Sequence, residues 1–155
     1  MLEIRTVGDE VLRRKSKSVK TVNSVIRRLL DEMAATMQHE SGIGLAAPQV
    51  GIAKRVLVAD VGDGLIELIN PEILFAQGSQ VGLEGCLSIP DVVGEVSRAD
   101  SVRVTGLNRD GHQVWLEANG LTPISTQFGQ VWYRISLPQF RWRCRFLTAL
   151  PLWCR

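Results

Sequence analysis

The sequence predicts an α+β domain in which antiparallel sheets pack around helices. One long amphipathic segment is followed by several short β-branched segments, and an Asp-Gly pair separates two apolar stretches near residue 110. The chain has 155 residues, of which 45% are hydrophobic and 22% charged, so it can bury one core without metals or disulfides. This composition excludes disordered and fibrous proteins.

Residues 21–40 are predicted to form the main helix. Apolar side chains recur there at intervals of three and four residues, and charged side chains fall on the opposite face. Asn23 or Thr21 can cap the amino end of this helix. We expect Gly42 and Gly44 to end it, because glycine readily adopts the left-handed conformation that closes a helix.

From residue 55 onward the pattern is typical of strands. Four short β-branched segments are bounded by Gly, Pro, Asn or Asp: 55–60, 65–69, 72–75 and 102–107. Asp110-Gly111 separates the last of these from residues 113–118, and this pair predicts a hairpin. Antiparallel pairing is therefore expected.

Charge, hydropathy and cysteine content narrow the class of protein. The formal net charge of +2 is too small to indicate nucleic acid or anionic lipid as a partner. No run of eighteen apolar residues and no signal-like amino end is present, so we expect a cytoplasmic protein with no membrane partner. Cys86, Cys144 and Cys154 are widely spaced and suit a reducing compartment better than a disulfide framework.

The composition of the chain changes abruptly near residue 122. All sixteen acidic residues lie before residue 118, whereas residues 122–155 contain five arginines and no other charged side chain. Residues 1–121 hold 13 basic and 16 acidic side chains, a formal charge of −3, against +5 for the remainder. We therefore treat 1–121 as the domain and 122–155 as an atypical tail.

The segment at residues 42–51, Gly-Ile-Gly-Leu-Ala-Ala-Pro-Gln-Val-Gly, admits two interpretations. It has too many small residues for a packed helix and too many apolar ones for a solvated loop. It can be a plain turn from helix to strand. It can also be the wall of a groove, where a peptide approaches the backbone closely and Gln49 donates a hydrogen bond.

The segment at residues 84–90, Glu-Gly-Cys-Leu-Ser-Ile-Pro, places a cysteine two residues after an acid. A buried free cysteine is most often a small apolar side chain, but Cys86 can also be a metal ligand or a thiolate nucleophile. No histidine is placed by the sequence to activate a nucleophile. His39-Glu40 ends the first helix and His112 follows Gly111 in the hairpin turn, so both histidines are expected at the surface.

Together and in this order, GIGLAAPQVG and EGCLSIP resemble the first two signature motifs of the peptide deformylases. These hydrolases remove the formyl group from the amino-terminal methionine of new bacterial and organellar proteins. The resemblance covers residues 2–121. It implies a cytoplasmic, bacterial, metal-dependent hydrolase of linear amides. It also implies partners: the N-formylmethionyl peptides of nascent chains at the ribosome, with no nucleic acid read directly.

The resemblance also implies a role for each matching residue. Cys86 would bind a divalent metal, iron(II), which nickel, cobalt or zinc can replace. Gln49 and the backbone N–H of Leu87 would donate hydrogen bonds to the formyl oxygen as it gains charge. Glu84 and Arg98 would form an ion pair that braces the cysteine loop. The substrate peptide would lie along four residues: Ile43, Gly44, Leu45 and Gly85.

The third motif of the family is missing from this chain. It should be a His-Glu-x-x-His helix shortly after Leu121, which supplies two metal ligands and a general base. Residues 122–129 read Thr-Pro-Ile-Ser-Thr-Gln-Phe-Gly instead, with no histidine after His112 and no acid after Glu117. The chain is therefore expected to be an impaired deformylase. The alternative is a non-catalytic relative that at most binds formyl-methionyl peptides.

The tail permits a hypothesis about its origin. The stretch 133–138, Tyr-Arg-Ile-Ser-Leu-Pro, can be encoded by codons that, displaced by one base, read Ile-Glu-Tyr-Leu-Ser. An acidic residue followed by Tyr-Leu-Ser comes after the metal helix in the family. We hypothesise that residues from about 122 onward are a deformylase carboxyl end read in the wrong frame.

Overall fold

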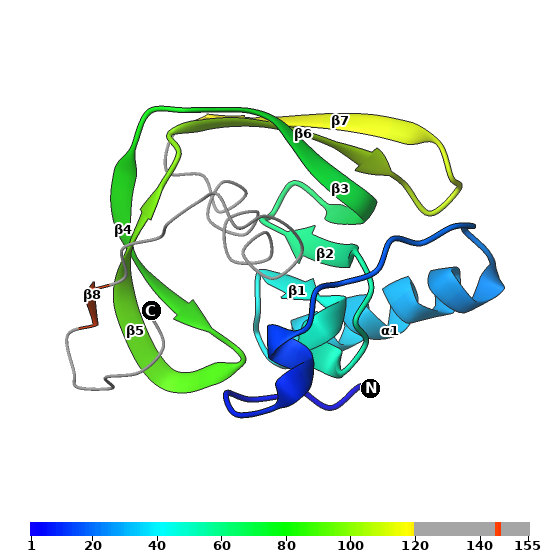
Figure 1. The fold of residues 1–155 in the computed structure, drawn as a ribbon, viewed down its shortest axis with the longest axis horizontal. Coiled ribbons are helices and arrows are strands. Elements are labelled where there is room, and N and C mark those ends of the chain that lie inside the picture. Colours follow the sequence, from blue (N-terminus) through cyan, green and yellow to red (C-terminus); the bar gives the residue numbers. More distant parts are fainter. Residues whose placement is uncertain (120–144, 147–155) are drawn as a thin grey trace.

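Two antiparallel sheets and one long helix form the part of the chain that the computed structural model describes, residues 1–119 and 145–146 (Figure 1). The smaller sheet has the order β4-β5-β8 and the larger one the order β1-β2-β3-β6-β7. The strands of the larger sheet are β1 (Gly44–Ala46), β2 (Val56–Asp60), β3 (Leu65–Gln77), β6 (Ser101–Leu107) and β7 (Gln113–Asn119). Those of the smaller sheet are β4 (Gln80–Cys86), β5 (Ile89–Arg98) and β8 (Arg145–Phe146). The predicted α+β class with antiparallel sheets is confirmed.

The helix α1 (Ser24–His39) begins where the sequence predicted a cap. The side chain of Asn23, and not that of Thr21, accepts a hydrogen bond of 3.1 Å from the backbone N–H of Ile26. This bond satisfies one of the N–H groups that a helix leaves open at its first turn.

The prediction that glycines close this helix was wrong. The residue with a left-handed backbone after α1 is Ser41, with φ of 53°, and Gly44 already belongs to β1. Gly42 still takes part in the closure without a left-handed backbone, since its N–H donates to the carbonyl of Met37 at 2.9 Å. A Cβ at this position would lie 2.8 Å from Cδ1 of Leu87. The missing side chain lets the end of the helix pack directly against the segment that carries the cysteine.

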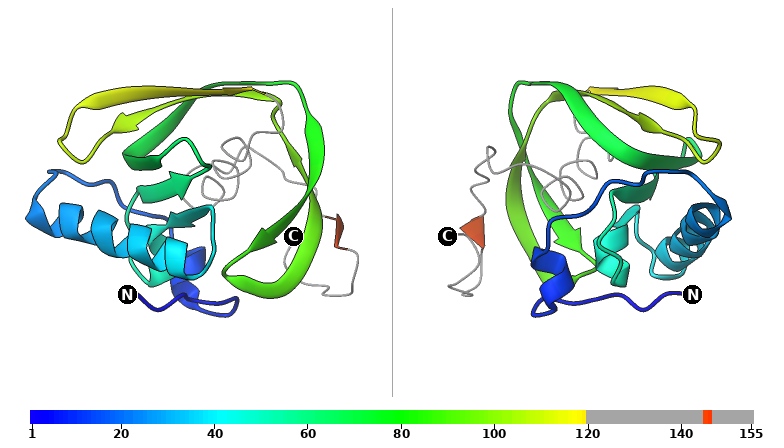
Figure 2. Two further views of the ribbon diagram at one scale, coloured as in Figure 1. Left: turned by 180° about the vertical axis from the view of Figure 1, so that it is seen from behind. Right: turned by 45° about the vertical axis from the view of Figure 1, so that its right-hand side comes forward.

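The larger sheet buries side chains on both faces. Because side chains alternate along a strand, neighbours such as Val56 and Leu57 enter different apolar clusters. The first cluster joins the sheet to α1, which lies along one side of it (Figure 2). The helix contributes Ile26, Leu29, Leu30, Met33 and Met37 to this cluster, and the sheet contributes Leu45, Val56, Val58 and Ile69. The second cluster is formed by Ala46, Leu57, Leu68 and Val104.

The strand β3 joins two segments that the sequence predicted as separate strands, 65–69 and 72–75. Between them Asn70 has a φ of 51°, and the pairing with β6 shifts its register there. The Asn70 side chain explains the irregularity, since its amide accepts from the N–H and donates to the carbonyl of Val19, both at 2.8 Å. The strand thus bends to hold the segment before α1 and then continues.

Of two hairpins, β6–β7 and β4–β5, the sequence predicted only the first. The Asp110-Gly111 turn between β6 and β7 is confirmed, with Gly111 at a φ of 83°. The longer hairpin of β4 and β5 was not predicted. It curls away from the larger sheet in Figure 1 and carries Cys86 at the end of its first strand. Within the described ranges, no helix is both long and apolar enough to cross a membrane.

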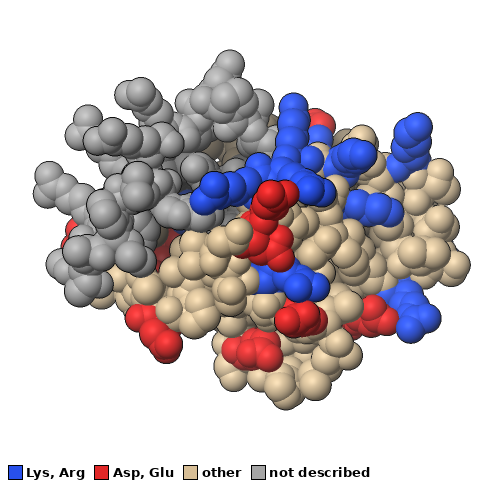
Figure 3. Space-filling view, turned by 60° about the horizontal axis from the view of Figure 1, so that its bottom comes forward, with Lys and Arg blue, Asp and Glu red and all other residues tan. Residues whose placement is uncertain are grey.

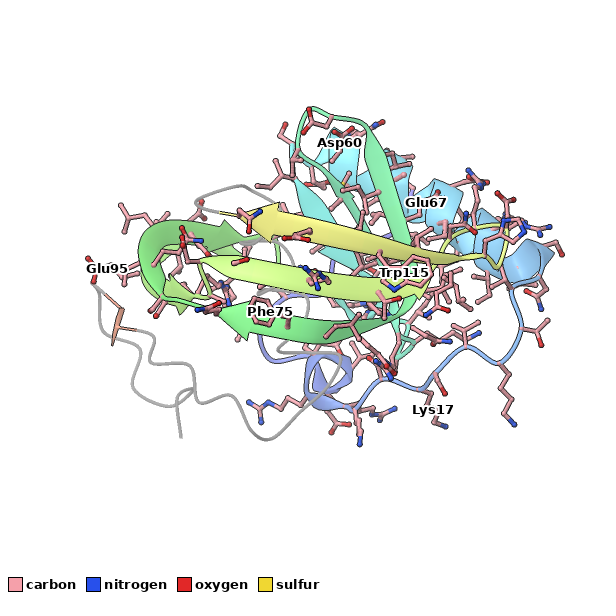
Figure 4. The ribbon with its side chains drawn as sticks, turned by 90° about the horizontal axis from the view of Figure 1, so that it is seen from above. Lys17, Asp60, Glu67, Phe75, Glu95 and Trp115 are labelled. Atoms are coloured by element: carbon pink, nitrogen blue, oxygen red, sulfur yellow. The ribbon has the colours of Figure 1, made fainter. Side chains whose placement is uncertain are left out.

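A buried carboxyl group links the sheet to the helix and the hairpin turn. The Glu67 side chain, labelled in Figure 4, is 9% exposed, and its carboxylate lies 3.5 Å from Nη1 of Arg109. Arg109 also pairs with Asp31 of α1 at 2.7 Å. Desolvation raises the pKa of Glu67 above its ordinary value, and the attraction of Arg109 opposes this only in part.

We expect Glu67→Gln to flatten the pH dependence of stability. A carboxyl group whose pKa is raised by folding binds its proton more tightly in the folded state, so the free energy of unfolding falls as pH rises from the ordinary carboxyl pKa through the raised one. The variant removes this decline. Urea unfolding from about pH 4 to pH 8 measures it. Glu117→Gln, which removes an exposed carboxylate from a surface ion pair, is the control, and an equal flattening there would contradict the assignment.

Candidate functional site

The two sequence motifs meet at Gln49 and Cys86. Gln49 lies in the 3-10 helix η2 (Ala47–Val50), directly after β1, and its side chain is buried. Its Nε2 lies 3.8 Å from Sγ of Cys86 and 3.2 Å from Oγ of Ser88. An amide donor is therefore held against a thiol that is 37 residues further along the chain.

Hydrogen bonds on both sides of Gln49 fix the orientation of its amide. The Oε1 atom accepts from the backbone N–H of Ala46 at 2.9 Å, so the NH₂ group must face Cys86. The backbone carbonyl of Gln49 accepts from the N–H of Arg5 at 2.7 Å. Gly51, with a φ of 84°, then ends η2. The glutamine is thus locked before any ligand arrives.

Ser88 is a site residue that the sequence analysis did not single out. Its side chain is fully buried, its Oγ accepts from Gln49, and its carbonyl accepts from the N–H of Val7 at 2.8 Å. The amino-terminal segment therefore binds both motifs through backbone groups. A serine two residues after a cysteine gave no local signal of this contact.

Glu84 and Arg98 form a buried ion pair beside the cysteine. Their side chains are 6% and 7% exposed, and the guanidinium donates from Nε to Oε1 at 3.1 Å and from Nη2 to Oε2 at 2.6 Å. Glu84 and Cys86 lie two residues apart on β4, where side chains two apart share a face. The pair therefore anchors the stretch of strand that presents the thiol.

An open strand edge lies next to these groups. β1 pairs with β2 through Gly44↔Ala59 and Leu45↔Val58, and it has no second partner strand among the described residues. Leu45 is fully buried and Ile43 is 43% exposed. Such an edge offers backbone groups on which an extended peptide can pair.

Gly85 and Leu87 flank the cysteine on either side. Gly85 is exposed on β4, and a Cβ there would meet only the carbonyl oxygen of Val92, at 3.9 Å. Leu87 is partly buried and packs against the main core next to Gly42. On the leucine side, the loop that holds the thiol is therefore packed against the core.

The described residues do not complete a divalent-metal centre. Cys86 is partly exposed and can supply one thiolate, but no group of three His, Cys, Asp or Glu within residues 1–119 could hold an ion. His39 is exposed and lies 3.1 Å from Glu40, and His112 is exposed in the β6–β7 turn, as the sequence indicated. Cys144 and Cys154 lie outside the described residues.

Fold and site together define a class of protein. It is an α+β protein in which an open strand edge runs beside a locked amide donor and a partly exposed thiol, an arrangement that can hold an extended peptide. Residues 1–127 match the family model for polypeptide deformylase. The chain belongs to the polypeptide deformylase family.

Individual relatives show the same likeness. A peptide deformylase from Acetivibrio thermocellus is 54% identical over 122 residues, which cover 79% of this chain and 72% of the relative. One from Thermoanaerobacter pseudethanolicus is 53% identical over 118 residues, 76% of this chain and 74% of the relative. The crystal structure of the Thermotoga maritima peptide deformylase has a TM-score of 0.80 at 38% identity and covers 88% of this chain and 99% of its own. That of the Synechococcus elongatus enzyme in complex with actinonin has a TM-score of 0.81 at 35% identity, covering 86% and 75%.

Proposed function

We propose that this chain is an impaired deformylase, which binds N-formylmethionyl peptides, the substrates of peptide deformylases, but hydrolyses their formyl group hardly faster than the uncatalysed reaction. The observation that carries the proposal is the locked amide of Gln49 beside Cys86, next to the open edge of β1. The fold of the family supports a peptide hydrolase, whereas the donor set for its metal is incomplete.

The peptide would pair with the β1 edge along Ile43, Gly44 and Leu45. Glycine at position 44 leaves room for close backbone approach, and the exposed Ile43 offers apolar contact to a substrate side chain. Gly85, which precedes Cys86 on β4, would contact the formyl end of the peptide.

The formyl oxygen would receive hydrogen bonds from Gln49 and from the backbone N–H of Leu87. The Gln49 amide has two protons, and its 3.8 Å contact to sulfur is the longer of its two donor contacts. An incoming oxygen can replace the sulfur as the acceptor of that proton, while the other proton keeps its bond to Ser88. Donors held in place before charge develops stabilise an oxyanion most.

In this proposal the chain differs from its catalytic relatives because it binds the formyl peptide without a metal. The family metal, iron(II) with nickel, cobalt or zinc as replacements, needs several ligands, and among the described residues the site supplies only Cys86. We therefore derive no hydrolytic step through a metal here. A cytoplasmic location and an encounter with nascent chains at the ribosome belong to the same proposal.

After dialysis the protein is expected to retain far less than one equivalent of iron, nickel or zinc, because a single thiolate holds a divalent ion weakly. Elemental analysis measures this. Hydrolysis of a formyl-Met-Ala-Ser peptide with added iron(II) or nickel should stay near the uncatalysed rate. A full equivalent of retained metal, or turnover like that of an intact deformylase, would show that ligands from residues 120–155 complete the site.

Peptide binding separates a non-catalytic binding protein from an inactive fold. Line broadening of a formyl-Met-Ala-Ser peptide in NMR spectra should appear with the protein and diminish in Gln49→Ala. Gln113→Ala, an exposed glutamine on β7, is the matched control. If Gln49→Ala and Gln113→Ala broaden the peptide lines equally, Gln49 does not bind the peptide.

The origin of residues 122–155 can be tested at the level of the gene. We infer that these residues are a deformylase carboxyl end read in the wrong frame. The shift in composition at residue 122 and the codon match at residues 133–138 support this inference. The hypothesis also requires that some of the normal carboxyl end is missing. The nucleotide sequence, translated one base later, should then encode a family-like segment, Ile-Glu-Tyr-Leu-Ser, at residues 133–138, and the absence of such a segment would disprove the frameshift.

A further inference from the structure

A strap of basic residues crosses the surface between the first 3-10 helix, η1 (Glu10–Arg13), and α1. We call residues 13–20, Arg-Arg-Lys-Ser-Lys-Ser-Val-Lys, the basic strap; it carries five cations and no acid. All five basic residues are exposed, whereas Leu12, Ser16 and Val19 are buried and fasten the segment to the fold. The strap is thus fixed at its apolar positions and presents its charges to solvent.

Lys54, the fourth lysine of the chain, is paired through its backbone with Lys17 of the strap. Lys17 donates from its backbone N–H to the carbonyl of Ala53 at 2.9 Å and accepts from the N–H of Arg55 at 2.9 Å. These bonds form a parallel bridge between Lys17 and Lys54, which makes the two lysines backbone neighbours across the bridge. Figure 4 shows Lys17 on the outside of the ribbon.

The charges of these lysines are not balanced within the described structure. The four lysines of the chain all lie here, at positions 15, 17, 20 and 54, and none takes part in an ion pair among residues 1–119. The face in Figure 3 shows basic side chains gathered in a band, with acidic side chains mostly to one side of it. Outside the strap, residues 1–121 hold eight basic and sixteen acidic side chains. The net charge is therefore small only because the excess of basic side chains in the strap is offset by an excess of acidic side chains elsewhere.

We propose that the basic strap and Lys54 dock the phosphate backbone of RNA without reading its sequence. Lysine is a point charge that binds phosphate, and the strap exposes no aromatic, Asn or Gln side chain that could stack on a base or read its edge. Around Lys17, where the backbone pairs as in a strand, residues two apart lie ~6.6 Å apart on one side. Lys15 and Lys17 have this spacing, so the strap offers one cation to each of two neighbouring phosphates of a single nucleic-acid strand.

The same residues fit other anionic partners less well. A membrane-binding segment needs exposed apolar side chains to enter the lipid, and the apolar residues of the strap are buried. A protein interface is typically centred on aromatic or apolar anchors, which the strap lacks. The choice of RNA over DNA rests on the proposed function, because new polypeptides are made beside ribosomal RNA.

The test compares two double variants that lose the same charge. Lys17→Gln with Lys54→Gln removes the two lysines of the bridge, and Arg28→Gln with Arg103→Gln removes two exposed cations from surface ion pairs on α1 and β6. Both keep the five arginines of residues 122–155. Fluorescence anisotropy with a labelled, mixed-sequence single-stranded RNA of about 20 nucleotides measures affinity at several salt concentrations.

At ~0.1 M salt the lysine variant should bind RNA at least about fivefold more weakly than the arginine variant. When the logarithm of the binding constant is plotted against the logarithm of the salt concentration, the slope for the lysine variant should be shallower by ~1.4, because each lost phosphate contact lowers it by ~0.7. Circular dichroism should show both variants folded. Equal affinities would overturn the proposal. So would a labelled DNA of the same sequence binding tenfold more tightly than the RNA, or polyglutamate or phosphatidylserine vesicles binding more tightly than the RNA. None of these readouts depends on metal or formyl-peptide hydrolysis.

Discussion

Replacing residues 122–155 by a peptide deformylase carboxyl end with His-Glu-x-x-His after Leu121 is expected to restore metal binding and deformylation together. The parts that this chain lacks are two imidazoles and one carboxylate on a single helix. Cys86, Gln49 and the open edge of β1 are already in position. Elemental analysis should find about one equivalent of metal, and a formyl-Met-Ala-Ser assay should find turnover where the original chain gives almost none.

Two substitutions in this chimera separate the roles of Cys86 and Gln49. Cys86→Ala should abolish metal retention, because two histidines alone leave the site one ligand short. Gln49→Ala should keep the metal and lower kcat roughly a hundredfold or more, as the loss of other oxyanion donors does. Gln113→Ala, which truncates an exposed glutamine on β7, is the control and should keep both properties. A folded chimera that binds metal without Cys86, or turns over equally fast without Gln49, would refute these roles.

The elements that could be predicted from the sequence are those whose signals are local. The helix α1 follows from apolar residues spaced at threes and fours, and its start follows from the short side chain of Asn23. The β6–β7 hairpin follows from Asp110-Gly111. The sequence predicted β3 as two strands because the cause of its bend is not local. The strand bends at Asn70, whose side chain forms hydrogen bonds with Val19, 51 residues away.

The β4–β5 hairpin and the site depend on contacts between distant segments. Glycines interrupt β4 and β5 at positions 82, 85 and 94, so neither strand shows a clear two-residue period. Resemblance to the family brought Gln49 and Cys86 together before the structure did. Nothing in the sequence indicated that the N–H groups of Arg5 and Val7 would bind the two motifs, because backbone donors carry no mark of their partners.

Breaking the ion pair of Glu84 and Arg98 should be among the most destabilising single substitutions in the described chain. Glu84→Gln is expected to lower the free energy of unfolding by ~3–5 kcal/mol, because Arg98 keeps its buried charge and loses its carboxylate. The exposed pair of Arg103 and Glu117, at 3.2 Å, provides the comparison, and Glu117→Gln should cost no more than about 1 kcal/mol. Urea unfolding measures both.

A second readout connects this ion pair to the site. If the pair braces the end of β4, Glu84→Gln should speed the alkylation of Cys86 by iodoacetamide, followed peptide by peptide in a mass spectrometer so that Cys144 and Cys154 are counted separately. Replacing both partners by apolar residues, as Glu84→Leu with Arg98→Met, should recover much of the lost stability, because no unpaired charge is then buried. In the apolar double variant, Cys86 should still be alkylated faster than in the original chain. This result is expected because the hydrogen bonds of the ion pair, and not only its burial, hold the thiol in place. Equal unfolding energies for Glu84→Gln and Glu117→Gln, with unchanged alkylation of Cys86, would show that the pair braces nothing.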